Sequence, residues 1–388
     1  MRAALFTNNY LPFCGGVTIS VETLRRGLEV NGHEAWVFAP RFPGPHADGR
    51  RVVRYPSLPA ATYPEFALAV PYSHRIACFV KGLDVDVLHA HHPFLLGPAA
   101  ARLARRLARP IVFTYHTRYE KYAHYVPLPR RVVEAAAVRL STRFADRSDA
   151  VIAPSALIRD ELRARGVRAP IAVVPTGVDL ERFSPGDRTA ARLALGLPAA
   201  GTLLLYVGRL DPEKSVDRVL LAFDRLAGTI PDACLLLVGQ GTESMALRAR
   251  ARRLAAAARI AFLGARPHDA LADCYRAADA FLFASETETQ GLVLAEAAAC
   301  GTPAVAVSAP GCEEVVRDGE TGLLTKSEPT ALAEAAIGLL LDAPRRRQMA
   351  RAARATAERE FDVRLQIGRT LDVYAEASAR HRLRTRRA

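Results

Sequence analysis

Short apolar runs alternate with longer stretches rich in Ala, Leu and Arg along almost the whole chain of 388 residues. Short apolar runs are typical of strands buried on both faces, and strands that alternate with helices indicate a parallel sheet covered on both sides. The pattern therefore predicts an α/β protein. In the first half of the chain we expect strands at 2–6, 34–39, 85–90, 111–114, 150–153 and 171–174.

A segment rich in Pro and Gly, 175–186, interrupts this alternation. A second series of strands is expected at 203–207, 234–238, 260–263, 280–283, 303–307 and 322–325. Because the length exceeds what one core usually covers, we place Rossmann-like domains at 1–177 and 178–360, with a helix and basic tail at 361–388 that returns to the first domain. Doubly wound sheets bind ligands at the carboxyl ends of their strands, so we expect the functional residues there, facing a cleft between the domains.

Composition narrows the class of protein. Half of the residues are hydrophobic, yet no apolar run is long enough to span a bilayer, and the first apolar run is too short for a signal peptide. The six cysteines include no C-x-x-C pair, which argues against a disulfide framework or a zinc site. These features predict a cytoplasmic protein.

The formal net charge of +13 comes mainly from arginine and indicates a polyanionic partner. Nucleic acid, an anionic membrane surface and a diphosphate substrate all fit this charge. A general bias of the composition toward arginine and alanine explains much of the arginine count without any partner. It explains the excess over acidic residues less well.

The most specific chemical signal follows the strand expected at 280–283. A polar loop leads to Gly291, where we expect a helix to begin that ends at Gly301. Unpaired N–H groups at a helix N-terminus, with no side chain at Gly291 to cover them, suit a diphosphate. Glu288 and Glu296 lie on either side of this site, about 7–8 Å apart for five residues of helix, so each can accept hydrogen bonds from a sugar hydroxyl. Taken singly, either glutamate would be an ordinary charge at a helix end.

A second cluster follows the strand expected at 203–207. Gly208 ends that strand, and Arg209 and Lys214 flank the next turn. Both cations can therefore converge on one phosphate cluster at the carboxyl end of the strand. Without the paired glutamates Glu288 and Glu296, Arg209 and Lys214 would be read as ordinary surface residues.

Three further features carry weaker signals. Gly15 and Gly16 follow the first strand and permit close approach to a ligand, although alone they fit a simple strand-to-helix turn better. Asp84 and Asp86 form a D-x-D pair, but they precede their strand, at the end of the sheet away from the ligand. The histidines that follow have no carboxylate or cysteine partner nearby, so we expect packing or cleft-lining roles and no required metal. These histidines are His89, His91 and His92.

In combination, these motifs resemble glycosyltransferase family 4, whose members have the GT-B fold and transfer sugars with retention of anomeric configuration. The resemblance covers nearly the whole chain. It rests on the E-x7-E pair within 288–296, the Gly-Arg and Lys spacing within 208–214 and the glycine loop at 15–16. Thr289 and Gln290 replace a Pro-Phe found in many relatives, a variant similar to the glycolipid-forming subgroup.

The resemblance implies a role for each residue of these motifs. Glu288 would contact the donor sugar, while the amides of Gly291 and Leu292 would contact phosphate. Glu296 would hold the ribose. Further donor contacts are expected from Gly15, Gly16, Gly208, Arg209, Lys214 and Arg266.

The loop at 114–127 crowds aromatic, basic and histidine residues, a composition typical of functional loops. It is similar to the corresponding segment of diacylglycerol glucosyltransferases, which implies that His116 lies beside the donor sugar. A helix expected after Pro127 separates an apolar face from several arginines, which suits either an anionic bilayer or packing on the sheet. That face comprises Val133, Ala136, Ala137, Leu140 and Phe144. Contacts to the acceptor or membrane are expected from Tyr119, Tyr122, His124, Arg130 and Arg131.

Retention requires either double displacement through a carboxylate or front-face attack, in which the leaving diphosphate takes the acceptor proton. No motif of the first domain supplies a carboxylate nucleophile. We therefore favour front-face attack, with Arg209 and Lys214 stabilising the developing charge. The expected catalytic residues are His116, Glu288, Arg209 and Lys214.

We expect a hexosyltransferase that uses a nucleotide-diphosphate sugar, with UDP-glucose favoured, and a lipid acceptor such as diacylglycerol. It would need no cofactor, bind no nucleic acid and work as a peripheral protein at the inner face of the membrane. A soluble acceptor, or phosphatidylinositol with GDP-mannose as donor, stays open as an alternative, as does a nucleotide-sugar epimerase. A dinucleotide oxidoreductase fits less well, because no complete G-x-G-x-x-G joins a strand to a helix.

Overall fold

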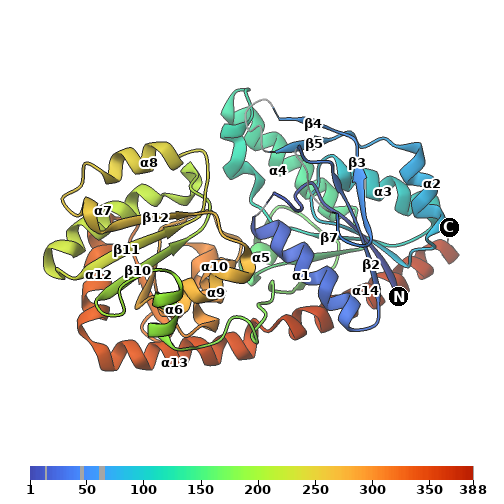
Figure 1. Ribbon diagram of the computed structural model, residues 1–388. Coiled ribbons are helices and arrows are strands. Elements are labelled where there is room, and N and C mark those ends of the chain that lie inside the picture. Colours follow the sequence, from blue (N-terminus) through green and yellow to red (C-terminus); the bar gives the residue numbers. More distant parts are fainter. Residues whose placement is uncertain (14, 44–47, 61–65, 388) are drawn as a thin grey trace. The chain divides into compact units, whose positions relative to one another are not determined.

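The computed structural model describes residues 1–13, 15–43, 48–60 and 66–387, and leaves the side chains of the last two undescribed. Cys14, which precedes the paired glycines of the expected glycine loop, lies outside the described residues. The chain forms two compact units (Figure 1). The first unit comprises Met1–Gly177 and Val363–Ala388, and the second comprises Val178–Asp362.

The first unit is built on a seven-stranded parallel sheet with the order β3-β2-β1-β6-β7-β8-β9. Its strands are β1 (Arg2–Phe6), β2 (Glu34–Pro40), β3 (Val52–Tyr55), β6 (Val87–Ala90), β7 (Ile111–Thr114), β8 (Ala150–Ala153) and β9 (Ile171–Val173). A separate antiparallel pair joins β4 (Ser57–Pro59) to β5 (Ala67–Ala69). The sequence pattern did not predict β3, β4 or β5, because these short strands lie at an edge or outside the main sheet and lack a continuous buried apolar run.

Helices cover both faces of this sheet, and each face has its own core of buried side chains (Figure 1). They are α1 (Gly16–Val30), α2 (His74–Gly82), α3 (Leu96–Leu107), α4 (Arg130–Asp146), α5 (Ala156–Ala164) and α14 (Val363–Arg387), with a 3-10 helix η1 (Tyr119–Tyr125). The carboxyl-terminal helix α14 buries Ile367 and Tyr374 in the core beside α1. A Cβ at Gly27 of α1 would come within 2.4 Å of Ile367, so the two helices pack closely at that glycine.

The second unit has a six-stranded parallel sheet with the order β12-β11-β10-β13-β14-β15 and one hydrophobic core. Its strands are β10 (Thr202–Val207), β11 (Ala233–Val238), β12 (Ile260–Gly264), β13 (Ala280–Phe283), β14 (Ala304–Val307) and β15 (Gly322–Thr325). Its α-helices are α6 (Arg188–Ala194), α7 (Val216–Thr229), α8 (Ser244–Ala251), α9 (Leu271–Ala277), α10 (Leu292–Ala299), α11 (Pro310–Glu313), α12 (Pro329–Leu341) and α13 (Ala343–Glu360). Its 3-10 helices are η2 (Pro212–Lys214), η3 (Ala257–Arg259) and η4 (His268–Ala270).

Helix α4 differs from the expectation drawn from its sequence. The residues that it buries are Ala137, Ser141 and Ala145, which follow one another at intervals of four. Helix α4 packs against η1, and small side chains at this spacing lie on one face of a helix. Of the apolar face expected from the sequence, only Ala137 is buried, and the side chain of Leu140 is 52% exposed. Much of the expected face is therefore not covered by the sheet.

Candidate functional site

The loop between β13 and α10 places Glu288 through close backbone packing. Gly291 caps α10 with a φ of +74°, a left-handed conformation that favours glycine. A Cβ at Gly291 would also lie 3.1 Å from the carbonyl oxygen of Gly311. At Gly311, a Cβ would come within 2.4 Å of Glu288. Both glycines are thus needed for the backbone to hold Glu288, and the helix begins at Leu292, one residue later than the sequence suggested.

Glu288 forms an ion pair with Lys214, although 74 residues separate them. Lys214 Nζ donates a hydrogen bond of 2.5 Å to Glu288 Oε1, and the side chains are only 14% and 17% exposed. Burial by itself raises the pKa of the Glu288 carboxyl, but the charge and hydrogen bond of Lys214, together with Ser285 and Arg209, hold that pKa below its usual value. Glu288, expected to contact the donor sugar, and Lys214, expected to contact the diphosphate, are therefore joined by a direct hydrogen bond.

Arg209 follows Gly208 at the carboxyl end of β10 and binds two carboxylates. Its guanidinium donates to Asp211, and to Glu213 Oε1 at 2.5 Å. Asp211 is fully buried and also accepts hydrogen bonds from the backbone N–H and the hydroxyl of Thr242, at 2.7 and 2.9 Å. The sequence analysis missed both carboxylates, because acidic residues next to a turn are common and only the fold shows that they hold Arg209.

Glu296 lies inside α10 and is 2% exposed. One carboxylate oxygen accepts a hydrogen bond of 2.8 Å from the Tyr275 hydroxyl, and the other lies 2.7 Å from His268 Nε2. Burial raises the pKa of Tyr275 well above its usual value, so the phenol stays a hydrogen-bond donor. His268 and Tyr275 are functional candidates that the sequence did not reveal. Arg266 lies in the same loop as His268 and is exposed.

In the first unit, His116 follows β7 and heads a chain of buried polar contacts. His116 Nε2 lies 2.9 Å from His91 Nδ1, and the rings of His91 and His89 lie 4.1 Å apart. His89 in turn contacts the hydroxyls of Thr114 and of Tyr374 in α14, both at 2.7 Å. This series of side-chain contacts therefore connects the carboxyl-terminal helix α14 to His116, the residue expected beside the donor sugar.

Burial keeps these histidines neutral. It lowers the pKa of His89, His92 and His116 to about 3 each, and it holds the pKa of His91 well below its usual value. His92 Nδ1 accepts a hydrogen bond of 3.1 Å from the backbone N–H of Asn8. In the part of the chain that the structure describes, no three His, Cys, Asp or Glu side chains come together in a way that could hold a metal ion.

The glycine loop and the D-x-D pair occupy opposite ends of the first sheet. Gly15 caps α1 with extended backbone, and a Cβ at Gly16 would meet no atom within 4 Å, so packing does not require glycine at either position. Asp86 accepts a hydrogen bond of 2.6 Å from the backbone N–H of Arg2, and Asp84 pairs with Arg109. The two aspartates thus make structural contacts at the amino ends of the strands.

The aromatic loop forms η1 and divides its residues between the interior and the surface. Tyr119 packs edge-on against Phe94 and is partly buried against the core, whereas Tyr122 and His124 stack on each other with centroids 6.5 Å apart. Arg130 and Arg131 are exposed at the start of α4. No helix in the described part of the chain is long and apolar enough to cross a membrane.

Two families of known proteins match the chain. Residues 14–182 match glycosyltransferase family 4, and residues 187–356 match the family described as glycosyl transferases group 1. A solved structure, the sucrose-phosphate synthase of Thermosynechococcus elongatus, has a similar fold with a TM-score of 0.82, at 24% identity over 97% of this chain and 99% of that chain.

Three relatives are similar to most of the chain. The α-monoglucosyldiacylglycerol synthase of Streptococcus pneumoniae is 31% identical over 84% of this chain and 76% of its own. The GDP-mannose-dependent α-mannosyltransferase of Mycobacterium tuberculosis is 34% identical over 84% of this chain and 83% of its own. The D-inositol 3-phosphate glycosyltransferase of Acidothermus cellulolyticus is 37% identical over 76% of this chain and 68% of its own.

Proposed function

The chain belongs to glycosyltransferase family 4 and has its GT-B fold of two Rossmann-like domains, and on this premise we propose that it is a retaining hexosyltransferase that uses a nucleotide-diphosphate sugar. UDP-glucose is the favoured donor and a lipid such as diacylglycerol the favoured acceptor. The observation that carries the proposal is the cluster at the strand ends of the second unit, where Lys214 contacts Glu288 beside the N-terminus of α10.

Donor binding requires the cations of this cluster to exchange partners. Arg209 and Lys214 together contact three carboxylates, so the diphosphate has to compete with Asp211, Glu213 and Glu288. Asp211 keeps two hydrogen bonds from Thr242 when Arg209 turns to a phosphate, which lowers the cost of that exchange. Once Lys214 binds phosphate, Glu288 is free to accept a hydrogen bond from a sugar hydroxyl.

The favoured chemical step is front-face attack. The acceptor oxygen bonds to the anomeric carbon as the bond to the diphosphate breaks, and the acceptor proton passes to a diphosphate oxygen on the same face. Arg209 and Lys214 stabilise the negative charge that develops on the leaving group. His116, whose pKa of about 3 keeps it neutral, offers a hydrogen bond to the sugar without adding a charge.

Two observations support a lipid acceptor at a membrane surface. The relatives in Streptococcus pneumoniae and Acholeplasma laidlawii are named α-monoglucosyldiacylglycerol synthases. The start of α4 exposes Arg130 and Arg131 together with the apolar side chains of Leu128 and Val132. Each basic residue near an anionic leaflet contributes about 1 kcal/mol of attraction, and exposed apolar side chains can enter the lipid boundary.

A second candidate function follows from the other relatives. Those named GDP-mannose-dependent α-mannosyltransferase and D-inositol 3-phosphate glycosyltransferase are as similar to this chain as the diacylglycerol synthases. They favour a guanosine donor or an inositol acceptor within the same family and reaction class. A nucleotide-sugar epimerase shares the Rossmann layout but turns over its donor without an acceptor.

The test pairs each donor with each acceptor in the presence of EDTA. UDP-glucose, UDP-galactose and GDP-mannose are offered with vesicles that contain diacylglycerol or phosphatidylinositol, and with D-inositol 3-phosphate in solution. We expect α-glucosyl diacylglycerol from UDP-glucose, and undiminished turnover in EDTA because Arg209 and Lys214 take the place of a metal. Mannosyl transfer to an inositol acceptor would replace the favoured donor and acceptor. Activity that is lost in EDTA and restored only by a divalent ion would refute the proposal that Arg209 and Lys214 take the place of a metal.

The membrane part is tested separately by sedimentation with liposomes. Binding should rise with anionic lipid content and fall with salt, and Arg130→Glu/Arg131→Glu should weaken it. Full activity on a water-soluble acceptor with no liposome binding at low salt would overturn the lipid acceptor.

A further inference from the structure

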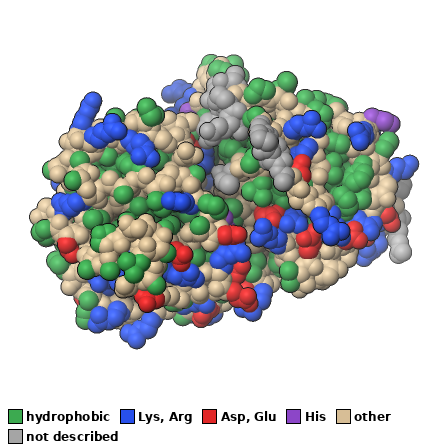
Figure 2. All heavy atoms as spheres, in the orientation of Figure 1, with side chains coloured by type: hydrophobic (Ala, Val, Ile, Leu, Met, Phe, Trp, Pro, Cys, Tyr) green, Lys and Arg blue, Asp and Glu red, His purple; other side chains and the backbone are tan. Residues whose placement is uncertain are grey.

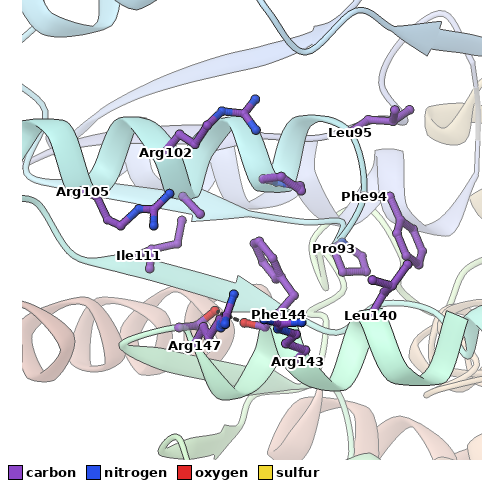
Figure 3. A pocket seen from close by; sticks show the side chains of 13 residues that line it. Pro93, Phe94, Leu95, Arg102, Arg105, Ile111, Leu140, Arg143, Phe144 and Arg147 are labelled. Carbon is purple, nitrogen blue, oxygen red and sulfur yellow. Dashed lines mark hydrogen bonds between the residues drawn. The ribbon is translucent and has the colours of Figure 1, made fainter. Parts of the chain in front are cut away.

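A groove of about 750 Å³ lies between α3 and α4 of the first unit (Figure 3). Its apolar lining comes from the loop after β6 and from α4, and includes Phe94, Leu95, Leu140 and Phe144. Pockets that bury small ligands have volumes of about 300–1,000 Å³ and mostly apolar walls. The groove therefore has the size and lining of a binding site, and the proposed reaction does not use it.

Arginines gather at one end of this groove. Arg105 lies in the last turn of α3, Arg143 lies in the last turn of α4, and Arg147 follows α4 as its C-cap. Figure 3 shows the side chains of Ile111 and Phe144 in the groove together with those of Arg105, Arg143 and Arg147. A fourth lining arginine, Arg102, donates to the carbonyl of Pro71 and packs over the Tyr72 ring.

The charge at this end has no acidic counterpart in the structure. None of Arg105, Arg143 and Arg147 pairs with a carboxylate among the residues that the structure describes. Two acidic residues close to this end in sequence are engaged in other contacts. Asp146 accepts a hydrogen bond from the backbone of Arg168, and Asp149 accepts one from the backbone of Ile111. The carboxyl-terminal ends of helices favour basic residues. This preference accounts for the positive charge here but not for the apolar groove beside it.

Close contacts fix the loop after β6, which forms part of the groove. Asn8 donates to the carbonyl of Phe94 and accepts a hydrogen bond from the N–H of Leu96, at 3.1 and 3.3 Å. A Cβ at Gly97 would lie 1.9 Å from the carbonyl oxygen of His92 and 3.3 Å from the Phe144 ring. Because this packing fixes the loop after β6, the groove exists before any ligand enters it.

We propose that the groove binds one anionic phospholipid. An acyl chain lies along Phe94, Leu140 and Phe144, and the phosphate lies among Arg105, Arg143 and Arg147. Apolar walls next to unpaired cations match a molecule that is apolar at one end and anionic at the other. The side chain of Leu140, 52% exposed, continues from the groove onto the outer surface of α4, where a bilayer could deliver the lipid.

The experiment uses the intact chain and a short-chain phosphatidylglycerol below its micelle concentration, with binding measured by calorimetry. The double variant Arg105→Gln/Arg143→Gln is compared with Arg106→Gln/Arg139→Gln, which removes the same charge from the same two helices outside the groove. We expect binding of one lipid per chain, a loss of about tenfold or more in the first variant, and less than about twofold in the second.

Two further arms distinguish the chemistry of the ligand. The deacylated head group, glycerophosphoglycerol, should bind at least about tenfold more weakly than the lipid, because it cannot use the apolar walls. Leu140→Ser should weaken binding of the lipid and leave the weak binding of the head group unchanged. Equal binding of lipid and head group, equal losses in both arginine variants, or no binding of the lipid would each overturn the proposal. These outcomes do not depend on donor or acceptor, so failure here is distinct from failure of the proposed reaction.

Discussion

Lys214 and Glu288 should act in transfer as one unit, and a double-mutant cycle would reveal it. Their side chains meet at 2.5 Å in a largely buried place, so removing either one changes the state of the other. Lys214→Ala leaves a buried carboxylate without its cation, and Glu288→Ala leaves the ammonium without the group that positions it. Each single change therefore removes two functions: its own contact and the placement of its partner.

The expected magnitudes follow from this coupling. Loss of one preorganised group that stabilises developing charge costs about 2.7–4 kcal/mol, or about 10²–10³ in kcat. If the residues acted independently, the double variant would lose about 10⁴–10⁶. Close charged pairs couple by about 1.5 kcal/mol or more, and each 1.4 kcal/mol is tenfold. We therefore expect the double variant to fall short of the additive loss by at least about tenfold.

The assay is kcat/KM for the donor, measured for wild type, both single variants and the double variant at several pH values. Lys214→Ala should also move the acidic limb of the profile upward, because burial, no longer opposed by Lys214, raises the pKa of Glu288. Circular dichroism and thermal unfolding show whether each variant is folded. Additive losses in folded proteins, with an unchanged acidic limb, would refute the idea that this pair works as a unit.

Two other predictions follow from the buried hydrogen bonds. Glu296→Ala should raise KM for the donor more than it lowers kcat, because the ribose is remote from the reacting carbon. Tyr275→Phe, which removes a hydrogen bond to Glu296, should have the same effect more weakly. A main effect on kcat in either variant would contradict the assignment of Glu296 to the ribose. The pKa values of His89 and His92 are about 3 in the folded state, against about 6.5 in the unfolded chain. Their contribution to the free energy of unfolding is therefore complete above pH 6.5 and is lost as the pH falls, by about 2 kcal/mol for each residue at pH 5. Urea unfolding at pH 8 and pH 5 should show this loss in the wild type and a smaller one in His92→Asn, whereas an equal loss in both would rule out His92 as a source.

Arginine and lysine side chains are scattered over the face seen in Figure 2, and net charge alone did not distinguish among possible polyanionic partners. The motifs were more informative. The GT-B fold and the glycosyltransferase family were both predicted from the sequence and confirmed by the matches to known proteins. The nucleotide sugar, the lipid acceptor and the role of each site residue stay predictions.

The sequence by itself determined the features whose cause is local. Strands β8 and β13 are wholly apolar, and β1 and β7 are apolar except for Arg2 and Thr114 at their ends, because a parallel strand buried on both faces favours apolar residues along its length. The sequence also placed the start of a helix at Gly291, where the structure finds a left-handed cap that glycine adopts without strain.

The tertiary structure alone decided which side chains meet. Lys214 meets Glu288 across 74 residues, Glu296 meets His268 across 28, and His89 meets Tyr374 across 285. It also turned the small residues of α4 inward and left Leu140 at an uncovered groove. Local patterns indicate the kind of element. The buried face of a helix such as α4, and ion pairs and grooves, depend on contacts that exist only after elements remote in sequence have packed together.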